Sequence, residues 1–302
     1  MTGFSRIALI GFGEVGQTLG ADLLAAGAAV SAYDILFVHK DSVPSRALGA
    51  VRVRAAANAK DAVRSADLVI SAVTAEADIE AARSVAAGLA PGTFFLDLNS
   101  SSPATKRAAE KIADAAGGHY VEAAVMTPIG FKRIASYMLL GGPYSAAFIE
   151  RARPLGFTGE VFSDTVGQAA ATKLCRSVII KGLEALLSES MLAARYYGVE
   201  KTVLESLSDL LPLPDWEQTA RYLIARALEH GARRAEEMRE AAKTVAEAGV
   251  EPLMSEATVK RQQWSAARKE ALAKADELAA LLDALRKELR ERPAGILQGE
   301  TR

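Results

Sequence analysis

The first 165 residues alternate between short apolar runs and alanine-rich segments long enough to form helices. The apolar runs cover residues 6–10, 29–33, 68–73, 93–98, 120–125 and 137–140. Helical segments between them include residues 15–26, 79–88 and 104–116. Strands that alternate with such helices form parallel sheets with helices on both faces. The sequence therefore predicts an α/β domain over residues 1–165, with a doubly wound, mainly parallel sheet.

Strand patterns stop near Gly167, and residues 166–302 predict a second, all-α domain. Helices are expected over residues 168–197, 216–231, 232–248 and 265–292. The last of them carries an apolar stripe typical of an amphipathic helix, made of Leu278, Leu282, Leu285 and Leu289. A loop is expected at Pro212 and Pro214, and a disordered tail after Pro293.

Length and composition exclude several classes of partner. A chain of 302 residues is longer than one hydrophobic core usually serves, which agrees with two domains. The net charge is −1 with both signs mixed, so no overall field attracts nucleic acid or an anionic membrane. Cys175 is the one cysteine, which rules out a disulfide within the chain, and no apolar run is long enough to cross a bilayer. We therefore expect a cytoplasmic protein that binds neither nucleic acid nor membrane, with no metal site.

A glycine-rich turn follows the first apolar run and opens the first helical segment. It consists of Gly11, Phe12, Gly13, Glu14, Val15 and Gly16. The first glycine allows a tight turn, the second lets a pyrophosphate approach the backbone, and the third lets helix and strand pack closely. The helix N-terminus offers N–H groups and a partial positive charge to phosphates. The turn therefore predicts a dinucleotide-binding site, with a purely structural turn as the alternative.

Asp34 lies 18 residues after Gly16, where the second apolar run ends. A carboxylate at this place accepts hydrogen bonds from the adenosine ribose hydroxyls of NAD and repels the 2′-phosphate of NADP. His39, Lys40 and Arg46 follow closely and could tolerate such a phosphate. We therefore expect NAD as the cofactor, with NADP as the alternative.

Polar residues 97–103 follow another predicted strand and include Ser100. Small polar residues at the carboxyl end of a parallel strand face the ligand crevice, which makes Ser100 a candidate site residue. The alternative is a simple N-cap cluster for the helix that begins at Pro103.

Residues 167–173 open the long helix, and helical spacing puts Lys173, Ser177 and Lys181 on one face. Lys173 belongs to an otherwise small and apolar turn. If this turn packs against the first domain, burial and neighbouring cations lower the pKa of the lysine. A lysine with a lowered pKa can act as a general acid or base. The alternative is an ordinary solvated helix face.

Taken in order, these segments resemble the β-hydroxyacid dehydrogenase family, which includes 6-phosphogluconate and 3-hydroxyisobutyrate dehydrogenases. The likeness covers roughly residues 5–195 and begins with the glycine turn. The family's Asp-x-Ser-Thr…Pro motif is similar to residues 97–103, its substrate motif aligns with residues 122–128, and its Gly-x-Gly-x-x-x-Lys-x-x-Asn-Asn motif aligns with residues 167–177. Segments 176–186 and 230–238 look like those of a bacterial branch of NAD-binding, phosphogluconate dehydrogenase-like proteins.

The resemblance implies a Rossmann domain, a long interdomain helix and an all-α domain, assembled as a homodimer. It also implies hydride transfer between a nicotinamide and a β-hydroxy acid, or its keto or semialdehyde partner, with Lys173 as general acid or base. Cofactor contacts are expected from the glycine turn and from Asp34, Val73, Thr74 and Ser100. Substrate contacts are expected from Ser100, Glu122, Val125, Met126, Thr127, Arg176, Ser177 and Lys181.

Two departures from the family pattern concern the substrate. Met126-Thr127-Pro128 replaces Ser-Gly-Gly, a stretch that brings backbone N–H groups to the substrate carboxylate, and Pro128 has no N–H. Arg176-Ser177 replaces Asn-Asn, and an arginine can bind a carboxylate or phosphate through two hydrogen bonds. We therefore expect a small anionic hydroxy acid that differs from the substrates of the named family members.

Two other functions stay open at this point. An imine reductase shares the implied architecture, although those enzymes usually place a different residue where Lys173 stands. A non-catalytic NAD-binding sensor would keep the glycine turn and could dispense with the lysine. Further along the chain, His230, Arg233 and Arg234 share one helix face, as a surface charge cluster or as an anion site.

Overall fold

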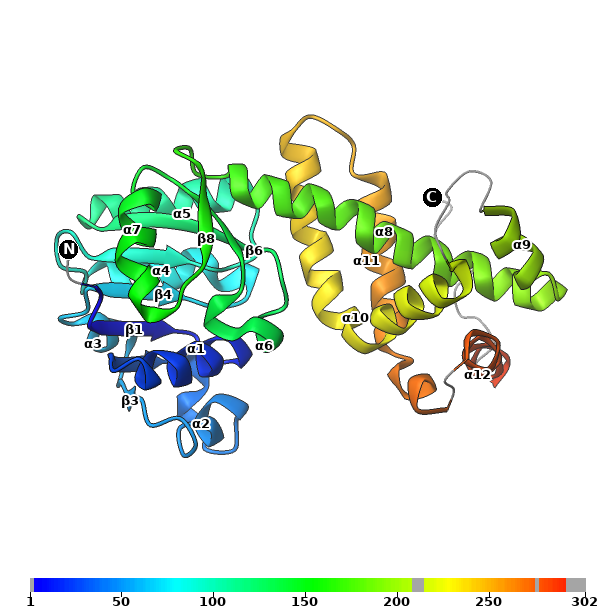
Figure 1. Ribbon diagram of the computed structural model, residues 1–302, viewed down its shortest axis with the longest axis horizontal. Coiled ribbons are helices and arrows are strands. Elements are labelled where there is room, and N and C mark those ends of the chain that lie inside the picture. Colours follow the sequence, from blue (N-terminus) through cyan, green and yellow to red (C-terminus); the bar gives the residue numbers. More distant parts are fainter. Residues whose placement is uncertain (1–2, 208–214, 275–276, 292–302) are drawn as a thin grey trace, which may run out of the picture. The chain divides into compact units, whose positions relative to one another are not determined.

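The computed structural model describes residues 3–207, 215–274 and 277–291. Contacts within the chain divide it into two compact units, Met1–Cys175 (unit 1) and Arg176–Arg302 (unit 2), whose elements are shown in Figure 1. The division falls inside a long helix, α8 (Gln168–Tyr197), so the beginning of this helix belongs to unit 1. The sequence places the domain boundary between residues 165 and 166, just before α8, and that boundary stays a prediction.

Unit 1 is built on one eight-stranded sheet with the order β3-β2-β1-β4-β5-β6-β7-β8. All neighbouring strands are parallel except β6 and β7, which confirms the predicted mainly parallel sheet. The apolar runs do not predict β3 or β8, because the side chains of these two edge strands are mostly exposed. The strands are β1 (Arg6–Ile10), β2 (Ala29–Tyr33), β3 (Arg54–Ala55), β4 (Leu68–Ser71), β5 (Phe94–Asp97), β6 (His119–Val125), β7 (Met138–Gly141) and β8 (Gly159–Ser163).

Helices cover both faces of this sheet. Helices α1 (Glu14–Ala25) and α7 (Ser145–Ala152) contribute to the core on one face, and α3 (Ala59–Val63), α4 (Asp78–Ala86) and α5 (Pro103–Ala115) contribute to the core on the other. The sheet is therefore doubly wound, as predicted. Shorter elements of unit 1 are α2 (Val43–Ala47), α6 (Ile129–Lys132) and the 3-10 turns Ile35–Val38, Ala75–Ala77, Arg133–Ala135 and Arg153–Leu155.

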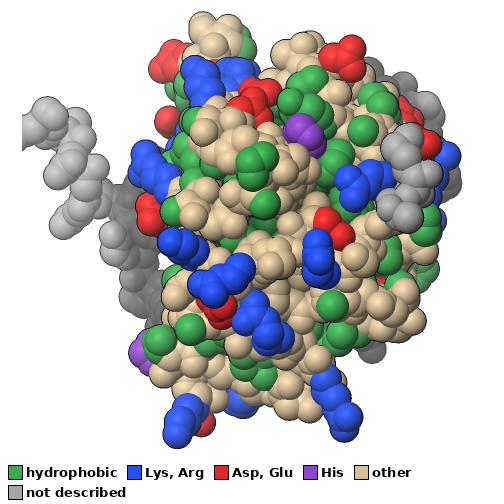
Figure 2. All heavy atoms as spheres, turned by 90° about the vertical axis from the view of Figure 1, so that its left-hand side faces the viewer, with side chains coloured by type: hydrophobic (Ala, Val, Ile, Leu, Met, Phe, Trp, Pro, Cys, Tyr) green, Lys and Arg blue, Asp and Glu red, His purple; other side chains and the backbone are tan. Residues whose placement is uncertain are grey.

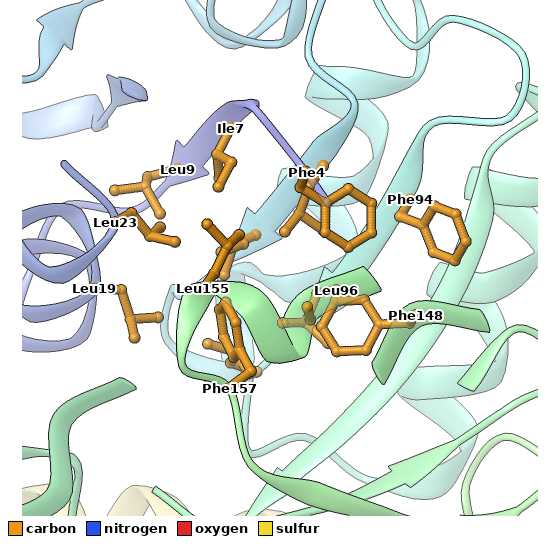
Figure 3. Close-up of a cluster of buried hydrophobic side chains, with 14 of the residues drawn as sticks. Phe4, Ile7, Leu9, Leu19, Leu23, Phe94, Leu96, Phe148, Leu155 and Phe157 are labelled. Atoms are coloured by element: carbon orange, nitrogen blue, oxygen red, sulfur yellow. The ribbon is translucent and has the colours of Figure 1, made fainter. Parts of the chain in front are cut away.

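Successive residues of the central strands point to opposite faces, so that each face has its own core. Ile7 and Leu9 of β1 pack with Leu23 of α1 and Phe148 of α7 in the first core, as Figure 3 shows. Ala8, between these two strand residues, belongs to the second core. Because both faces are buried, the central strands read as continuous apolar runs rather than as alternating ones.

The strand order places β1 between β2 and β4, so the chain connections turn away from each other at this point. In open α/β sheets, ligands bind outside the carboxyl ends of the strands at such a switch point. The glycine turn follows β1 directly, and the polar residues after β4 and β5 lie along the same edge of the sheet. The fold thus gathers the predicted cofactor residues of unit 1 at one edge.

Unit 2 is helical over its described residues. Besides the rest of α8 it contains α9 (Glu200–Leu207), α10 (Trp216–Glu247), α11 (Leu253–Ala266), a 3-10 segment (Lys269–Lys274) and α12 (Leu278–Glu291). Leu278, Leu282 and Leu285 of the predicted stripe are buried in its core. The loop predicted at Pro212 and Pro214 and the tail predicted after Pro293 lie outside the described residues.

Two helix predictions for unit 2 are wrong. Residues 265–292 are not one helix, because α11 ends at Ala266 and α12 begins only at Leu278. Residues 216–231 and 232–248 are not two helices, because α10 runs through Gly231. A Cβ at Gly231 would lie 2.5 Å from the carbonyl oxygen of Gln262 and 2.8 Å from the nitrogen of Ala266, both in α11. This glycine therefore serves close packing of two helices and does not break one.

Charges of both signs share the molecular surface. On the face drawn in Figure 2, Lys and Arg side chains are dispersed, with acidic and hydrophobic side chains between them. This mixture agrees with the net charge of −1.

Gly231→Ala is expected to lower the free energy of unfolding by about 1–3 kcal/mol, because the added methyl group meets the backbone of α11. Gly182→Ala in α8 is the matched control, since a Cβ there has nothing within 4 Å. The better helix propensity of alanine should make this control more stable by about 0.5–1 kcal/mol. Urea unfolding followed by circular dichroism measures both changes. A gain of stability in both variants would contradict the close approach of α10 and α11.

Candidate active site

The glycine turn links β1 to α1 at the switch point of the sheet. Gly11 has a φ of +92°, and a Cβ on it would lie 2.3 Å from the carbonyl oxygen of Ala72. A Cβ on Gly16 would lie 2.2 Å from the carbonyl oxygen of Gly11, so both positions require glycine. A Cβ on Gly13 would meet nothing within 4 Å, which leaves space beside the start of α1. Among the described side chains none caps this helix end, so its N–H groups can bind the phosphates of a dinucleotide.

Asp34 follows β2 and holds the glycine turn in shape. Its Oδ2 accepts a hydrogen bond from the Phe12 N–H at 2.7 Å, and its Oδ1 accepts one from the Leu36 N–H at 2.9 Å. The side chain of Phe12 is buried, so this residue can meet a cofactor only through its backbone. Asp34 is partly exposed, and an ionised carboxylate has further lone pairs for ribose hydroxyls.

The side chain of Asn99 joins the loops that follow β4 and β5. Its Oδ1 accepts a hydrogen bond from the Val73 N–H at 2.7 Å, and its Nδ2 donates to Ser71 Oγ and to Asp78 Oδ1, both at 2.9 Å. Asn99 thus fixes the loop of Val73, a predicted cofactor contact, against the segment that carries Ser100. The sequence motif contains Asn99, but no pattern in it indicates that this side chain points inward.

Three buried polar side chains meet behind the loop that follows β5. Lys106 Nζ lies 2.6 Å from Asp97 Oδ1, and the Tyr120 hydroxyl donates to Asp97 Oδ2 at 2.6 Å. Burial lowers the pKa of Lys106, but the charges of Asp97 and Asp78 outweigh this and leave the pKa above its ordinary value. Burial, together with Asp97, raises the pKa of Tyr120 well above its ordinary value. Lys106 is therefore a cation and Tyr120 a neutral donor at neutral pH. Sequence reasoning missed this cluster, although a lysine on the buried face of α5 is its visible signal.

The beginning of α8 brings Lys173 to the loop after β5. Lys173 Nζ donates a hydrogen bond to Ser100 Oγ at 2.8 Å, and both residues are half-buried. Glu122 of β6 is fully buried, and its carboxylate accepts hydrogen bonds from the N–H groups of Gly167 and Ala170 at 2.6 and 2.5 Å. Burial raises the pKa of Glu122. Unit 1 thus brings together Lys173 and Ser100, while Glu122 lies at the start of the helix.

The segment after β6 contains Met126, Thr127 and Pro128, which replace Ser-Gly-Gly of the family motif. The Met126 N–H donates to the Tyr137 carbonyl at 2.9 Å, which extends the pairing of β6 with β7 beyond Val125. Thr127 Oγ1 is buried and has no hydrogen-bond partner among the described residues. Pro128 then precedes α6. Of these three backbone positions, one N–H is already bonded and one does not exist, so an incoming carboxylate would find few donors here.

The continuation of this segment is bound to α1. Arg133 has a φ of +53°, a region that non-glycine residues rarely adopt. Its Nε and Nη2 donate to Asp22 Oδ1 at 2.9 and 2.7 Å, and the Ile134 N–H donates to Asp22 Oδ2 at 3.1 Å. These bonds hold the strained residue in place and connect the segment after Pro128 to the helix that begins at the glycine turn.

The predicted substrate residues of unit 2 lie on α8. Lys181 Nζ donates to Ser177 Oγ at 2.8 Å and forms an ion pair with Glu237 of α10 at 3.0 Å, whereas Arg176 is exposed. Glu237 also pairs with Arg233. The charge of Lys181 is therefore partly balanced within unit 2.

A buried polar cluster lies next to these residues in unit 2. Arg234 is buried and pairs with the fully buried Glu184, which also accepts a hydrogen bond from Gln262 Nε2 at 3.0 Å. Arg233 and Arg234, which share a helix face with His230, are thus both paired with glutamates. Glu184 of α8 binds Arg234 of α10 and Gln262 of α11, so Arg234 belongs to the core of unit 2 and not to a surface charge cluster.

The described residues contain neither a cluster of metal-binding side chains nor a membrane-spanning helix. No group of three or more His, Cys, Asp or Glu side chains in this part of the chain could hold a metal ion. None of the helices in the described ranges is long and apolar enough to span a membrane.

Two family models match successive parts of the chain. Residues 6–154 match the family model described as the NAD binding domain of 6-phosphogluconate dehydrogenase, and residues 194–265 match a domain of unknown function, DUF1932. The order of the two matches agrees with the Rossmann domain followed by an all-α domain that the sequence predicts.

Individual relatives extend over most of the chain. An NAD-dependent L-serine dehydrogenase of Pseudomonas aeruginosa is 29% identical over 212 residues, which cover 67% of this chain and 68% of the relative. A probable 3-hydroxyisobutyrate dehydrogenase of Mycobacterium tuberculosis is 26% identical over 214 residues, covering 68% and 69%. The solved structure of a conserved hypothetical protein of Sinorhizobium meliloti is 33% identical, has a TM-score of 0.75, and covers 94% of this chain and 97% of its own.

Imine reductases, the first alternative that the sequence leaves open, share this fold. An imine reductase of Streptomyces aurantiacus has a TM-score of 0.54 and 19% identity over 93% of this chain and 99% of its own. At this identity the likeness concerns the fold alone.

Asp34→Asn is expected to weaken binding of NADH about tenfold, because a hydrogen bond to a charged group is replaced by a neutral one. The preference for NADH over NADPH should narrow in the same variant, since repulsion of the 2′-phosphate is lost. Fluorescence titration of both nucleotides gives the dissociation constants. Asp41→Asn, at an exposed position after the same strand, is the control and should bind like the wild type. Equal affinity of the wild type for the two nucleotides would contradict the role of Asp34.

Asp78→Asn is expected to change how stability depends on pH. Burial and the nearby charge of Asp97 raise the pKa of Asp78 from its ordinary 3.8 to about 6. Ionised Asp78 therefore costs the folded state stability above that pH, and the cost disappears as the pH falls towards 3.8. A rise of this size corresponds to about 3 kcal/mol. The free energy of unfolding of the variant, relative to wild type, should increase by up to this amount between about pH 4 and pH 7.

Urea unfolding at several pH values measures this difference. Asp61→Asn is the control, because the hydrogen bond from Arg54 holds the pKa of Asp61 below its ordinary 3.8. Its difference from wild type should stay constant over the same range. A constant difference for Asp78→Asn as well would contradict the raised pKa.

Proposed function

Because the chain belongs to the β-hydroxyacid dehydrogenase family, we propose that it oxidises the hydroxyl group of a small anionic β-hydroxy acid, or reduces the matching carbonyl, with Lys173 as general base or acid. NAD-dependent oxidation of hydroxyl groups is the chemistry of this family, and unit 1 supplies its NAD-binding domain. The hydrogen bond between Lys173 and Ser100 carries the assignment of the lysine. It joins an amine to the edge of the sheet where the nucleotide-binding turn also lies.

The residues of unit 1 suit a bound dinucleotide. The open space at Gly13 and the free N–H groups at the start of α1 fit a pyrophosphate, and Asp34 offers acceptors to a ribose. Val73 and Ser100, on loops that Asn99 holds together, line the same edge. When bound, NAD supplies the acceptor for the hydride that leaves the carbon bearing the substrate hydroxyl.

Lys173 handles the proton of the same reaction. In the oxidation, its neutral amine takes the hydroxyl proton while the carbon–oxygen bond becomes a carbonyl, and in the reduction its ammonium returns that proton. The hydrogen bond to Ser100 Oγ positions the Lys173 amine before the substrate binds. An ammonium at this place also stabilises negative charge that develops on the substrate oxygen.

The proposed substrate is a small acid with a hydroxyl group on its β-carbon. L-Serine and 3-hydroxyisobutyrate, which the names of two relatives suggest, are small acids with a hydroxyl on the β-carbon. Val125, Met126 and Thr127 remain our candidates for substrate contacts in unit 1. The sequence also predicts contacts from Arg176, Ser177 and Lys181, which lie on α8 after Lys173. Met126 and Pro128 replace the family's N–H donors, so we expect the substrate carboxylate to depend on a cationic side chain instead, with Arg176 as the first candidate.

Lys173→Ala is expected to lower kcat by about 10²–10⁴-fold, which is the usual contribution of a general acid or base. Nucleotide reduction with L-serine, 3-hydroxyisobutyrate and a panel of other β-hydroxy acids, each with NAD and NADP, measures the rate. Binding of NADH should stay at the wild-type level, because the glycine turn and Asp34 are unchanged. Lys111→Ala, an exposed lysine of α5, is the matched control and should keep wild-type activity.

The outcomes separate the alternatives. Full turnover of a good substrate by Lys173→Ala would exclude the proposed mechanism. NAD binding without turnover of any hydroxy acid would favour a non-catalytic sensor. Reduction of cyclic imines, with no activity on hydroxy acids, would favour an imine reductase.

A further inference from the structure

The carboxylate of Glu122 lies where α8 begins. Its two oxygens accept hydrogen bonds from the N–H groups of Gly167 and Ala170, 45 and 48 residues later in the sequence. Both groups belong to the end of a helix where backbone N–H groups have no partner within the helix itself. A negative charge at this end also interacts favourably with the helix dipole. A side chain of strand β6 thus caps a helix that is remote in sequence.

Apolar packing holds the same turn from other sides. Ala169 is fully buried against Ala124 of β6 and Leu139 of β7, and Leu174 is buried as well. Gly167, just before the helix, has a φ of +105°, a conformation that favours glycine. The beginning of α8 therefore has little freedom to slide or rotate on the sheet.

The position of Lys173 depends on this turn, because both belong to the beginning of α8. It follows Ala170 by three residues, which corresponds to about 4.5 Å along the helix axis. Its Nζ reaches Ser100 Oγ at 2.8 Å. In an enzyme, a displacement of a reacting group by about 1 Å can cost on the order of 10²-fold in rate. A shift of the capped turn would therefore also move the Lys173 amine relative to Ser100.

The surroundings of Glu122 leave no room for a substrate. Its side chain is fully buried, and both oxygens are engaged by the helix. A Cβ on Gly141 of the neighbouring strand would lie 2.5 Å from Glu122 Oε2, so glycine is needed there to make space for the carboxylate. An anionic substrate would also be repelled by it. These features favour a role other than the substrate contact that the sequence predicts.

We propose that Glu122 is a positioning residue, which fixes the start of α8 and thereby holds Lys173 against Ser100. The inference rests on the proposed role of Lys173 in proton transfer. A carboxylate accepts both N–H bonds, whereas a glutamine side chain accepts only one and places an NH₂ group against the other N–H.

Glu122→Gln in the full-length protein tests this role, and Glu122→Asp, which keeps the charge on a shorter side chain, is the second variant. Hydrogen exchange over residues 166–174, followed by mass spectrometry, reports on the cap, and the rate of acetylation of Lys173 by acetic anhydride reports on the amine. We expect both rates to rise about tenfold in each variant, because glutamine lacks the charge and accepts only one N–H bond, and the shorter aspartate does not reach both N–H groups. With a hydroxy acid that the wild type turns over, kcat should fall while the KM for NAD stays unchanged.

Asp215→Ala provides a matched control, because Asp215 caps α10 through the Gln218 N–H at 2.8 Å. This variant loses a helix cap in unit 2 and should leave the acetylation rate of Lys173 at the wild-type value. Wild-type acetylation rates in both Glu122 variants, or an equal rise in Asp215→Ala, would overturn the inference.

Lys173→Ala distinguishes the two proposals. If that variant keeps full turnover, the proposed proton-transfer role of Lys173 fails, whatever the Glu122 variants show. If it is inactive while the Glu122 variants match the wild type in exchange, acetylation and kcat, only the positioning role fails.

Discussion

Two hydrogen bonds to the Glu122 carboxylate, from Gly167 just before α8 and from Ala170 in its first turn, attach the helix that carries Lys173 to the sheet. The rest of the proposed active site depends on this attachment, because the glycine turn and the lysine come from distant parts of the sequence. The sheet is their common reference, since the ends of its parallel strands meet at one edge. Packing of small residues such as Ala169 defines how near the helix lies, and the directional bonds define where its first turn begins.

Behind that edge the protein keeps charges in its interior. Asp78, Asp97 and Lys106 are all buried, and removing such groups from water costs several kcal/mol for each ion, which pairing does not always return. This arrangement is a weak source of stability. These buried charges have a structural role at the binding edge. Asp78 and Asp97 accept hydrogen bonds from Asn99, and Asn99 fixes the loops of Val73 and Ser100. Unit 1 thus combines a costly interior with a well-defined binding edge, a trade-off that is common at functional sites.

The sequence predicts the features of unit 1 that depend on neighbours along the chain. Buried strands read as apolar runs, and the steric requirements at Gly11 and Gly16 identify the nucleotide-binding edge. Features that depend on distant partners are not predictable in this way. Lys106 looks like any helical lysine until Asp97 is beside it, and β8 has exposed side chains that give no apolar run. Gly231 resembles a helix end, although its role is a contact with α11 that exists only in the folded chain.

Strand β6 carries the residue that caps α8, and the proposed substrate segment follows its end. Glu122 lies inside the strand, with its backbone paired to β5 and β7, whereas Met126, Thr127 and Pro128 lie beyond the strand end. Because the pairing fixes the strand backbone, the residues after Val125 can change without moving the carboxylate that caps α8. Substitutions at this strand end would therefore change the proposed substrate contacts and leave the proposed proton-transfer group, Lys173, where Glu122 holds the start of α8.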